Sequence, residues 1–355
     1  MNTRFINWEA LDRKHGLRSG NYNPNEVFGD VVKATNTFLD LVLNKSGMYK
    51  TGISAFAENP NKSQVISAFG SQNNFPESVL ETIDKFHETW EGDDYWREFF
   101  RTVNMRNMRR NGMDVETVGS TLTFESTPEG AKAKIYNISG EKLTILADMY
   151  SGGLNWSRRL LDDEEYWTIE DNAIAFASKW LHDLSANMYG LIEAIPSSQD
   201  LTWQAPVPSN LANTDANYAA VRDFETLNKA CYNILEALKD KNVGAGMNSS
   251  FRIIAPLALK PRLDRMMGVY NNMLAGAGFT GSRYNVMPPR YSLMLNDKTK
   301  WYVGIPNVKN YFIDRMGLTV FGQFDALSYS DMAVGWGRYG GAIVDVEQWQ
   351  RCAIA

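Results

Sequence analysis

The stretch from Thr168 to Ile195 decides the fold of this chain and reads TIEDNAIAFASKWLHDLSANMYGLIEAI. No proline interrupts it and Pro196 follows directly, so it predicts one long helix with a defined end. Thr168 and Asp171 have the spacing of a capping box, which puts the predicted start at residue 168. Apolar side chains recur every three or four residues, the period of one helix face, at Ala173, Ala177, Trp180, Leu184, Met188, Leu191 and Ile195. Alone, this pattern indicates an amphipathic helix, and the flanking sequence has to assign its role.

The composition is typical of a globular protein: the chain has 355 residues, of which 44% are hydrophobic, and a formal net charge of −5. The negative balance argues against a protein whose main role is to grip a nucleic-acid backbone. Cys231 and Cys352 are too few for a disulfide framework and fit a reducing compartment. The N-terminus has no apolar signal-peptide core, and no stretch approaches the roughly 18 apolar residues of a membrane span. We therefore expect a soluble, cytoplasmic product with no membrane partner.

Residues 111–147, ahead of the long helix, change from helical to strand periodicity. The alternating segments and their turn sequences are 121–125, 127–130, 131–136, 139–142 and 143–145. This pattern predicts a long, mostly polar β-hairpin or meander. The segment has too few large apolar residues for a core of its own, and isolated hairpins are marginally stable. We therefore expect this arm to lie on another surface.

Helix and strand patterns alternate through the rest of the chain, which predicts an α+β fold. Ahead of the arm, we expect helices from Asn23-Pro24 to about Gly47, from Pro76 to Trp90 and from Asp94 onward. After the long helix, we expect helices at 216–239 and 257–274 and strands at 251–255, 291–295 and 301–303, the last two around a turn at 296–298. The C-terminal residues 331–355 are expected to form two strands joined near Gly340-Gly341.

The segment that begins at Asp94 interleaves basic residues with aromatic ones. It carries Arg97, Arg101, Arg106, Arg109 and Arg110 among Tyr95, Trp96, Phe99 and Phe100. Such a mixture can bind nucleic acid. We favour a solvated helix face, or a strip that pairs with acidic residues of a neighbouring chain. The whole chain is acidic, and these aromatic residues cluster as a core would.

No stretch carries the pattern of a reaction centre. Gly276 to Gly281 matches G-x-G-x-x-G, but it follows a predicted helix, whereas a dinucleotide site needs the motif between a strand and a helix. A helix C-cap and loop explain these glycines better. His15, His87 and His182 lack metal-ligand spacing, and Asp162 to Glu165 lack the order of a calcium loop. We therefore expect no catalytic, cofactor or metal site and no enzymatic activity.

Three stretches carry a resemblance to a known family: VGSTLTFESTPEGAKAKIYNISGEKLTIL at 118–146, GLNWSRRLLDDEEYWTIEDNAIAFASKWL at 153–181 and SDMAVGWGRYGGAIVDVEQWQRCAI at 330–354. They resemble the E-loop, the entry into the spine helix and the closing strands of the peripheral domain in major capsid proteins of tailed double-stranded DNA bacteriophages with the Hong Kong 97-type fold. The resemblance covers about residues 95–355. It implies an N-terminal arm and helical region at 1–110, an E-loop at 111–147, a peripheral domain at 148–198 and 326–355 with the spine helix at 168–195, and an axial domain at 199–325.

The resemblance implies a structural protein that assembles with itself into hexamers and pentamers of an icosahedral shell around phage double-stranded DNA. Implied partners are further copies of the chain, portal, scaffolding or decoration proteins, and packaged DNA in non-specific contact. The implied location is the virion, after assembly in the host cytoplasm. The N-terminal segment shows one good helix and no long charged coil, so we expect a retained arm rather than a cleaved scaffold segment.

Charged residues in and beside the arm are the candidates for contacts between subunits. They are Lys132, Lys134, Lys142, Arg158, Arg159, Asp162, Asp163, Arg109 and Arg110. Some family members crosslink through a lysine of the E-loop, but no partner residue can be placed here, so a crosslink is not among the predictions. We also expect the long helix to pack its apolar face, including Trp180 and Met188, on the C-terminal strands around Val334 to Val346.

Three alternatives stay open. The same fold builds encapsulin nanocompartments, whose shells hold enzyme cargo instead of DNA. A nucleotide-binding α/β enzyme would use the loop from Gly276 to Gly281. A tail or portal-associated phage protein would form rings of one fixed size.

Overall fold

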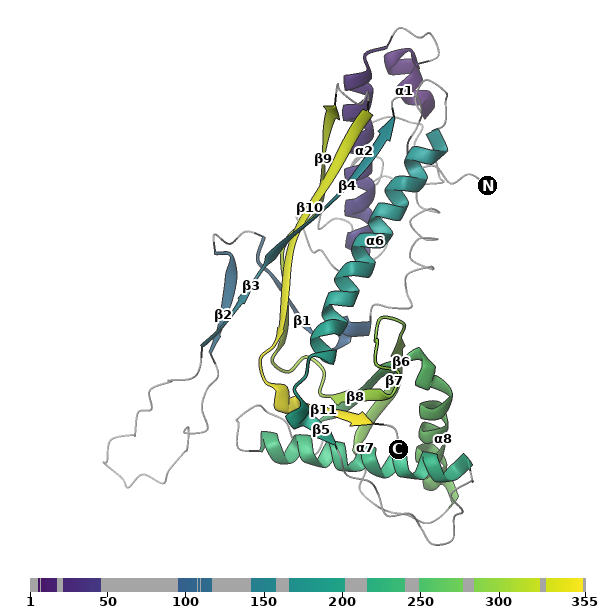
Figure 1. Cartoon of the computed structure of the whole chain (residues 1–355), viewed down its shortest axis with the longest axis vertical. Coiled ribbons are helices and arrows are strands. Elements are labelled where there is room, and N and C mark those ends of the chain that lie inside the picture. Colours follow the sequence, from purple (N-terminus) through teal and green to yellow (C-terminus); the bar gives the residue numbers. More distant parts are fainter. Residues whose placement is uncertain are drawn as a thin grey trace, which may run out of the picture.

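A computed structural model of the chain describes residues 6, 8–17, 22–45, 95–106, 108, 110–116, 142–157, 166–201, 216–239, 249–276, 284–325 and 330–353. The predicted α+β class is confirmed by its mixture of helices and strands. Figure 1 shows an elongated molecule with a long sheet and two long helices at one end and a smaller sheet with two helices at the other. None of the helices in the described ranges has the length and apolar character that a membrane-spanning segment requires.

The long sheet has four strands in the order β1-β9-β10-β4. Their bounds are Arg101–Asn104 for β1, Asn310–Asp325 for β9, Ser330–Ile343 for β10 and Asp148–Ser157 for β4. β10 pairs antiparallel with both β9 and β4, and β1 pairs parallel with the first residues of β9. This sheet joins the segment after the predicted arm to strands from the C-terminal third of the chain.

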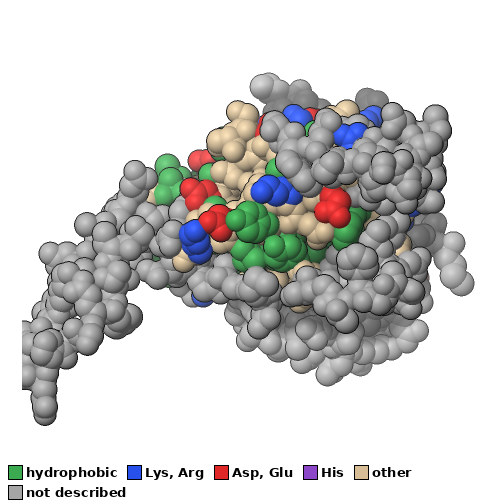
Figure 2. Space-filling model, turned by 90° about the horizontal axis from the view of Figure 1, so that it is seen from below, with side chains coloured by type: hydrophobic (Ala, Val, Ile, Leu, Met, Phe, Trp, Pro, Cys, Tyr) green, Lys and Arg blue, Asp and Glu red, His purple; other side chains and the backbone are tan. Residues whose placement is uncertain are grey.

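The smaller sheet has five strands in the order β5-β11-β8-β6-β7. Their bounds are Asp200–Leu201 for β5, Trp349–Ala353 for β11, Lys300–Gly304 for β8, Ser250–Pro256 for β6 and Asn285–Ser292 for β7. Helices α7 (Ala216–Leu238) and α8 (Lys260–Gly276) contribute to a core with one face of this sheet. Figure 2 views the molecule from this end, where the coloured acidic and basic side chains are interspersed rather than separated by charge.

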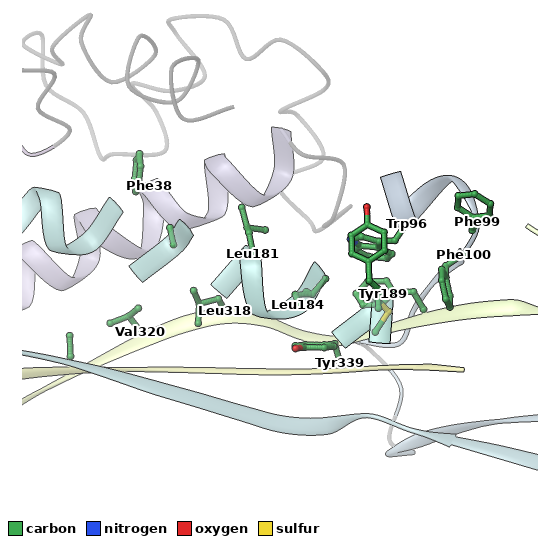
Figure 3. Packing of buried hydrophobic residues seen from close by; sticks show 14 of the residues in the cluster. Phe38, Trp96, Phe99, Phe100, Leu181, Leu184, Tyr189, Leu318, Val320 and Tyr339 are labelled. Atoms are coloured by element: carbon green, nitrogen blue, oxygen red, sulfur yellow. The ribbon is translucent and has the colours of Figure 1, made fainter. Parts of the chain in front are cut away.

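The long predicted helix is confirmed as α6, Tyr166–Glu193. It starts two residues before Thr168, so the predicted cap at that threonine is wrong, and the end agrees with the stop at Pro196. Its apolar face packs on β10 as predicted: the Trp180 ring meets the Tyr339 ring edge to face at 5.5 Å between centroids. Leu184, Met188 and Ala333 share the same buried cluster, and Figure 3 shows the helices lying on one side of the strands.

Helix α2 (Pro24–Lys45) confirms the predicted N-terminal helix and lies beside α6 on the same side of the long sheet. Its buried side chains, including Val27, Val31 and Phe38, join the core under α6. The short helix α1 (Trp8–His15) packs against it. Lys14 and His15 hold Asp30 of α2 at 2.6 and 2.9 Å. Burial raises the pKa of Asp30, but these two partners outweigh it and leave that pKa below its usual value.

The two cores lie on opposite faces of the five-stranded sheet. Ile253, Trp301 and Val303 face the cluster under α7 and α8, whereas Ile254 and Tyr302 belong to the cluster under α6. Side chains alternate across a strand, so neighbouring residues of β6 and β8 contribute to different cores. The smaller sheet therefore forms the wall between the two halves of the molecule.

Several expected elements differ from those observed. The helix expected from Asp94 is wrong: a 3-10 turn, η2 (Tyr95–Glu98), leads into strand β1, because Arg101 to Asn104 pair with β9. The expected strand break at Gly340-Gly341 is also wrong, since β10 runs through both glycines to Ile343. The chain turns instead through η5, Val346–Gln348, before β11.

The strands expected around the turn at 296–298 do not pair with each other. β7 begins at Asn285 and contains Pro288 and Pro289, and β6 lies between it and β8. As the edge strand of its sheet, β7 can hold prolines, which cannot donate to a ladder. The helices at 216–239 and 257–274 and the strand at 251–255 are confirmed within a few residues, with a 3-10 turn, η4 (Leu257–Leu259), opening α8. The helix expected from Pro76 to Trp90 lies outside the described residues.

Candidate assembly surface

Most of the proposed contact residues lie outside the described ranges. This is so for Lys132, Lys134, Arg109, Arg158, Arg159, Asp162 and Asp163, which stay predictions. Arg110 is described: its side chain is exposed and pairs with Asp114 of its own chain at 3.3 Å. Lys142 begins strand β3, where its backbone lies opposite Glu116. The structure thus places two of the nine candidates at the base of the arm.

The base of the predicted arm is an antiparallel pair, β2 (Gly112–Glu116) and β3 (Lys142–Leu146). Figure 1 shows this pair beside the long sheet, on the side away from α6, where β3 leads directly into β4. Thr144 donates to the Asp114 carboxylate at 2.8 Å across the pair. Leu143 and Leu146 expose 41% and 55% of their surfaces, so the base of the arm presents apolar side chains to its surroundings.

A small cluster fixes the base of the arm to the long sheet. Met105, Ile145, Ala147 and Ile313 form its buried centre. Arg338 of β10 donates to the side chain of Asn111, and the Asn111 carbonyl accepts from the Ala147 amide at 3.0 Å. The arm is therefore anchored at its root by packing and hydrogen bonds.

Asp314 of β9 adds a buried charge to this root. Its side chain is 2% exposed, and Arg106, from the segment between β1 and β2, brings Nε and Nη2 each to 2.9 Å from Oδ2. Burial raises the pKa of Asp314 to about 6, although Arg106 opposes the shift. Arg315, the next residue, donates to the Met105 carbonyl at 2.6 Å.

The face of the long sheet opposite α6 exposes large apolar side chains. Cβ positions at Gly335 and Gly337 point at Phe176 and Trp180 of α6, so Val334 and Trp336 point the other way. Phe321 lies opposite Val334 in register, and Met149 lies opposite Arg338, which places both on this far face. Met149, Phe321 and Trp336 are 57%, 57% and 36% exposed. Exposed apolar groups gathered on one face are typical of an interaction surface.

The two edges of the long sheet differ in what covers their backbone hydrogen-bonding groups. On the β9 edge, the Asn36 side chain of α2 donates to the Val320 carbonyl and accepts from the Val320 amide, each at 2.7 Å. One side chain thus replaces the pair of bonds that a neighbouring strand would make. On the β4 edge, the described part of the chain contributes no paired strand beyond β4. The first edge is closed by the chain's own helix.

Polar contacts hold the two halves of the molecule together. Glu98 accepts from Arg290 of β7 at 2.8 and 3.1 Å and also pairs with Arg252 of β6. Asn310, fully buried, accepts from Gln348 and Trp349 and donates to the Phe99 carbonyl. These contacts tie the start of β9, the turn before β11 and the end of η2 to one another.

Both cysteines are buried, and the glycine motif is described only at its first residue, Gly276. Burial raises the pKa of the Cys231 thiol to about 12 and that of Cys352 well above its usual value, which disfavours a reactive thiolate. Helix α8 ends at Gly276, so the start of the glycine motif follows a helix, as expected. In the described ranges, no three His, Cys, Asp or Glu residues lie close enough to hold a metal ion.

Three features of the surface were missed from the sequence. Asn36 and Asp314 form contacts with residues 284 and 208 positions away, which no local period shows. Asp314 interrupts a mostly apolar stretch, 311–320, and this interruption is the sequence feature that could have indicated a buried carboxylate. The exposure of Trp336 and Phe321 is the third, because alternation along a strand does not show which face of a sheet is covered.

No family model matches the chain, and no curated protein matches it. Among solved structures, it is similar to the capsid of Myoviridae phage XM1, with 9% identity, 73% of this chain and 90% of that chain covered, and a TM-score of 0.47. It is similar to the capsid structure of the cyanophage P-SCSP1u, with 14% identity, coverage of 75% and 88%, and a TM-score of 0.46. A virus-like particle from Pyrococcus furiosus gives 12% identity, coverage of 76% and 98%, and a TM-score of 0.41.

Proposed function

We propose that this chain is the structural subunit of a closed protein shell, the major capsid protein of a tailed double-stranded DNA bacteriophage with the Hong Kong 97-type fold. The observation that carries the proposal is that one subunit exposes two groups of large apolar side chains. The arm base exposes Leu143 and Leu146, and the far face of the long sheet exposes Met149, Phe321 and Trp336. Both surfaces would be buried by neighbouring copies of the chain.

Such surfaces suit a head-to-tail assembly. The arm of one subunit and the apolar sheet face of the next would form a heterologous contact, which closes into a ring when the rotation allows it. We assign hexamers and pentamers of an icosahedral shell to these rings. In this proposal the E-loop at 111–147 lies across a neighbouring subunit, with Lys132, Lys134 and Lys142 among its contact residues.

The domain assignment is also a proposal. Residues 148–198 and 326–355 would form the peripheral domain around the spine helix, and residues 199–325 the axial domain. The pairing of β9 with β10 along most of its length favours including residues 310–325 with the peripheral part. The pairing of β11 with β8 likewise favours counting Trp349–Ala353 with the axial part.

In this proposal the shell encloses phage DNA, which it meets through non-specific contacts, since the net charge of −5 offers no strong grip on a polyanion. Portal, scaffolding or decoration proteins are its further partners, and the virion is its location after assembly in the host cytoplasm. The contents of purified particles separate this function from an encapsulin-like compartment. Packaged DNA supports the capsid, whereas an enzyme cargo without DNA supports the compartment.

Removing the arm tests the proposal directly. In the variant, residues 117–141 are replaced by Asn-Gly, a dipeptide that closes two-residue hairpins, so that β2 and β3 stay joined. We expect a folded subunit with cooperative unfolding that no longer assembles, measured by sedimentation velocity beside the full-length chain. If the variant assembles like the full-length chain, or loses all cooperative unfolding, the arm is not an assembly element.

A further inference from the structure

We propose that a second copy of the chain adds a strand to the long sheet at the open edge of β4, and that residues 121–125 of its arm supply this strand. The inference rests on the proposed function and deepens it. It names the segment, and the hydrogen-bonding groups, through which one subunit binds the next.

β4 is the long edge of the two large sheets that has no protection within the described ranges. It pairs with β10 from Asp148 to Ser157 without a register shift, so its ten residues form a regular edge. It contains neither proline nor lysine, two residues that commonly block such an edge. The β9 edge is covered by β1 and Asn36, the edge strand β7 contains two prolines, and β5 has two residues. The β4 edge therefore offers backbone donors and acceptors to an added strand.

The far face of the long sheet forms a shallow trough along this edge. Ser151 and Gly153 of β4 are exposed, and they lie opposite Trp336 and Val334 of β10 in register. Residues two apart on a strand share a face, so two small residues lie between these larger side chains and the open edge. Large apolar side chains of an added strand could lie over this trough, defined by Ser151 and Gly153, and reach the flanks of Trp336 and Val334.

The described part of the subunit does not itself require a glycine at position 153. An added Cβ would lie 3.8 Å from the Ala333 carbonyl oxygen and 3.9 Å from Val334, which are ordinary van der Waals distances, and the φ of Gly153 is not left-handed. Gly335 and Gly337 differ, because a Cβ on either would overlap a ring of α6. A strand glycine commonly marks a place where another group approaches closely. At Gly153 that group would come from outside the subunit.

Residues 121–125 read TLTFE and have the pattern that fits the trough. Leu122 and Phe124 are two residues apart, so in an extended strand both lie on one face, at the spacing of Ser151 and Gly153. Directly opposed residues of paired strands have Cβ atoms about 5 Å apart. The two large side chains would therefore meet the two small positions of the trough.

The added strand comes from a second copy because the arm leaves its own subunit away from β4. β3 ends one residue before β4 begins, and Figure 1 shows the two strands following one line. Since β2 and β3 pair antiparallel, the chain between them departs from the end of β3 that lies farther from β4. Residues 117–141 would span roughly 40 Å as an extended hairpin, which is long enough to reach a neighbouring subunit.

Amide hydrogen exchange tests the pairing, with full-length assemblies compared against the variant in which Asn-Gly replaces residues 117–141. Alternate amides of an edge strand point away from its sheet. We expect this half of the β4 amides to exchange about tenfold more slowly in the assemblies than in the variant. The other half, which faces β10, should be protected in both and is the internal control.

The outcomes separate this inference from the proposed function. Assemblies in which the outward β4 amides exchange as fast as in the variant would overturn the strand addition and leave the shell function standing. Equal protection of these amides in both proteins would also overturn it, because the arm would not be the occupant. A full-length chain that stays monomeric would overturn both.

Cysteine pairs test which segment is the occupant. Chains with Phe124→Cys are co-expressed with chains that carry Gly153→Cys or Ser151→Cys, and the product is oxidised with diamide. We expect disulfide-linked dimers with one of the two, and none with Thr102→Cys on β1, the exposed strand at the opposite edge. The native cysteines are buried. Absence of dimers with both β4 variants, or equal dimer formation with Thr102→Cys, would overturn the assignment of residues 121–125.

A substitution that fills the trough completes the test. Gly153→Val should leave the urea midpoint of the arm-replaced subunit unchanged or raised, since a Cβ has room there. In the full-length chain it should lower the assembled fraction about tenfold, because the added side chain overpacks the contact with the second copy. Thr102→Val, on the opposite edge strand, is the control and should assemble like the unaltered chain. Assembly of Gly153→Val at the unaltered level would contradict the proposal.

Discussion

At the scale of single residues, close packing around β10 depends on glycine. A Cβ at Gly340 would overlap the backbone carbonyl oxygen of Leu146, where the arm crosses the sheet, and one at Gly337 would overlap the Trp180 ring. A backbone carbonyl held by the β2–β3 pair cannot move aside as a flexible side chain can. The glycines in VGWGRYGG therefore let both the helix and the arm root approach the strand.

Gly340→Ala should lower the free energy of unfolding by about 1–3 kcal/mol, the usual cost of overpacking a filled site. The matched control is Gly190→Ala, because Gly190 lies on α6 with nothing within 4 Å of an added Cβ. Alanine in a helix should raise stability there by about 0.5–1 kcal/mol. Urea unfolding of the two full-length variants measures both changes. Equal effects would show that the arm does not press on Gly340.

Residue patterns on α6 could be predicted because one helix period carries them. Trp180, Leu184 and Met188 were expected on the apolar face and on β10, and they lie there. Asp314 and Asn36 could not be predicted, because each takes its role from a residue more than 200 positions away. Sequence periodicity shows which side of an element is buried but not which polar group meets it.

At the scale of elements, the edge of β9 at Val320 is covered by one side chain, Asn36 of α2, so a single substitution can uncover it. Asn36→Ala removes both bonds to the Val320 backbone and should cost about 1–2 kcal/mol, since the freed amide and carbonyl lie in a partly buried place. It should also speed hydrogen exchange at the Val320 amide. Asn25→Ala, at the exposed first turn of the same helix, is the control. An unchanged Val320 exchange rate in Asn36→Ala would show that α2 does not protect this edge.

Elements set by local periodicity were predicted well, and elements set by pairing were not. α6, α7 and β6 were expected close to their observed bounds. The helix expected from Asp94 has the spacing of Trp96, Phe99 and Phe100 in its favour, yet its continuation pairs with β9 as a strand. β9 itself was not predicted, because its role depends on β10, which follows it in the chain.

At the scale of the whole molecule, two hydrophobic cores lie on opposite faces of one sheet. The five-stranded sheet gives one face to each core, and Glu98 and Asn310 hold the segments that cross between the halves. A body joined in this way suits a rigid building unit. The long helix and the paired base of the arm could be predicted from the sequence, whereas residues 117–141 of the arm lie outside the described ranges. The shared sheet could not be predicted, because its strands come from four separated segments.

Self-assembly is the central claim, and electron microscopy of the expressed full-length protein tests it most directly. The proposal predicts closed shells of uniform size with sixfold and fivefold clusters of subunits on their surface. A monodisperse monomer at every salt and protein concentration would contradict it, as would rings of one fixed size.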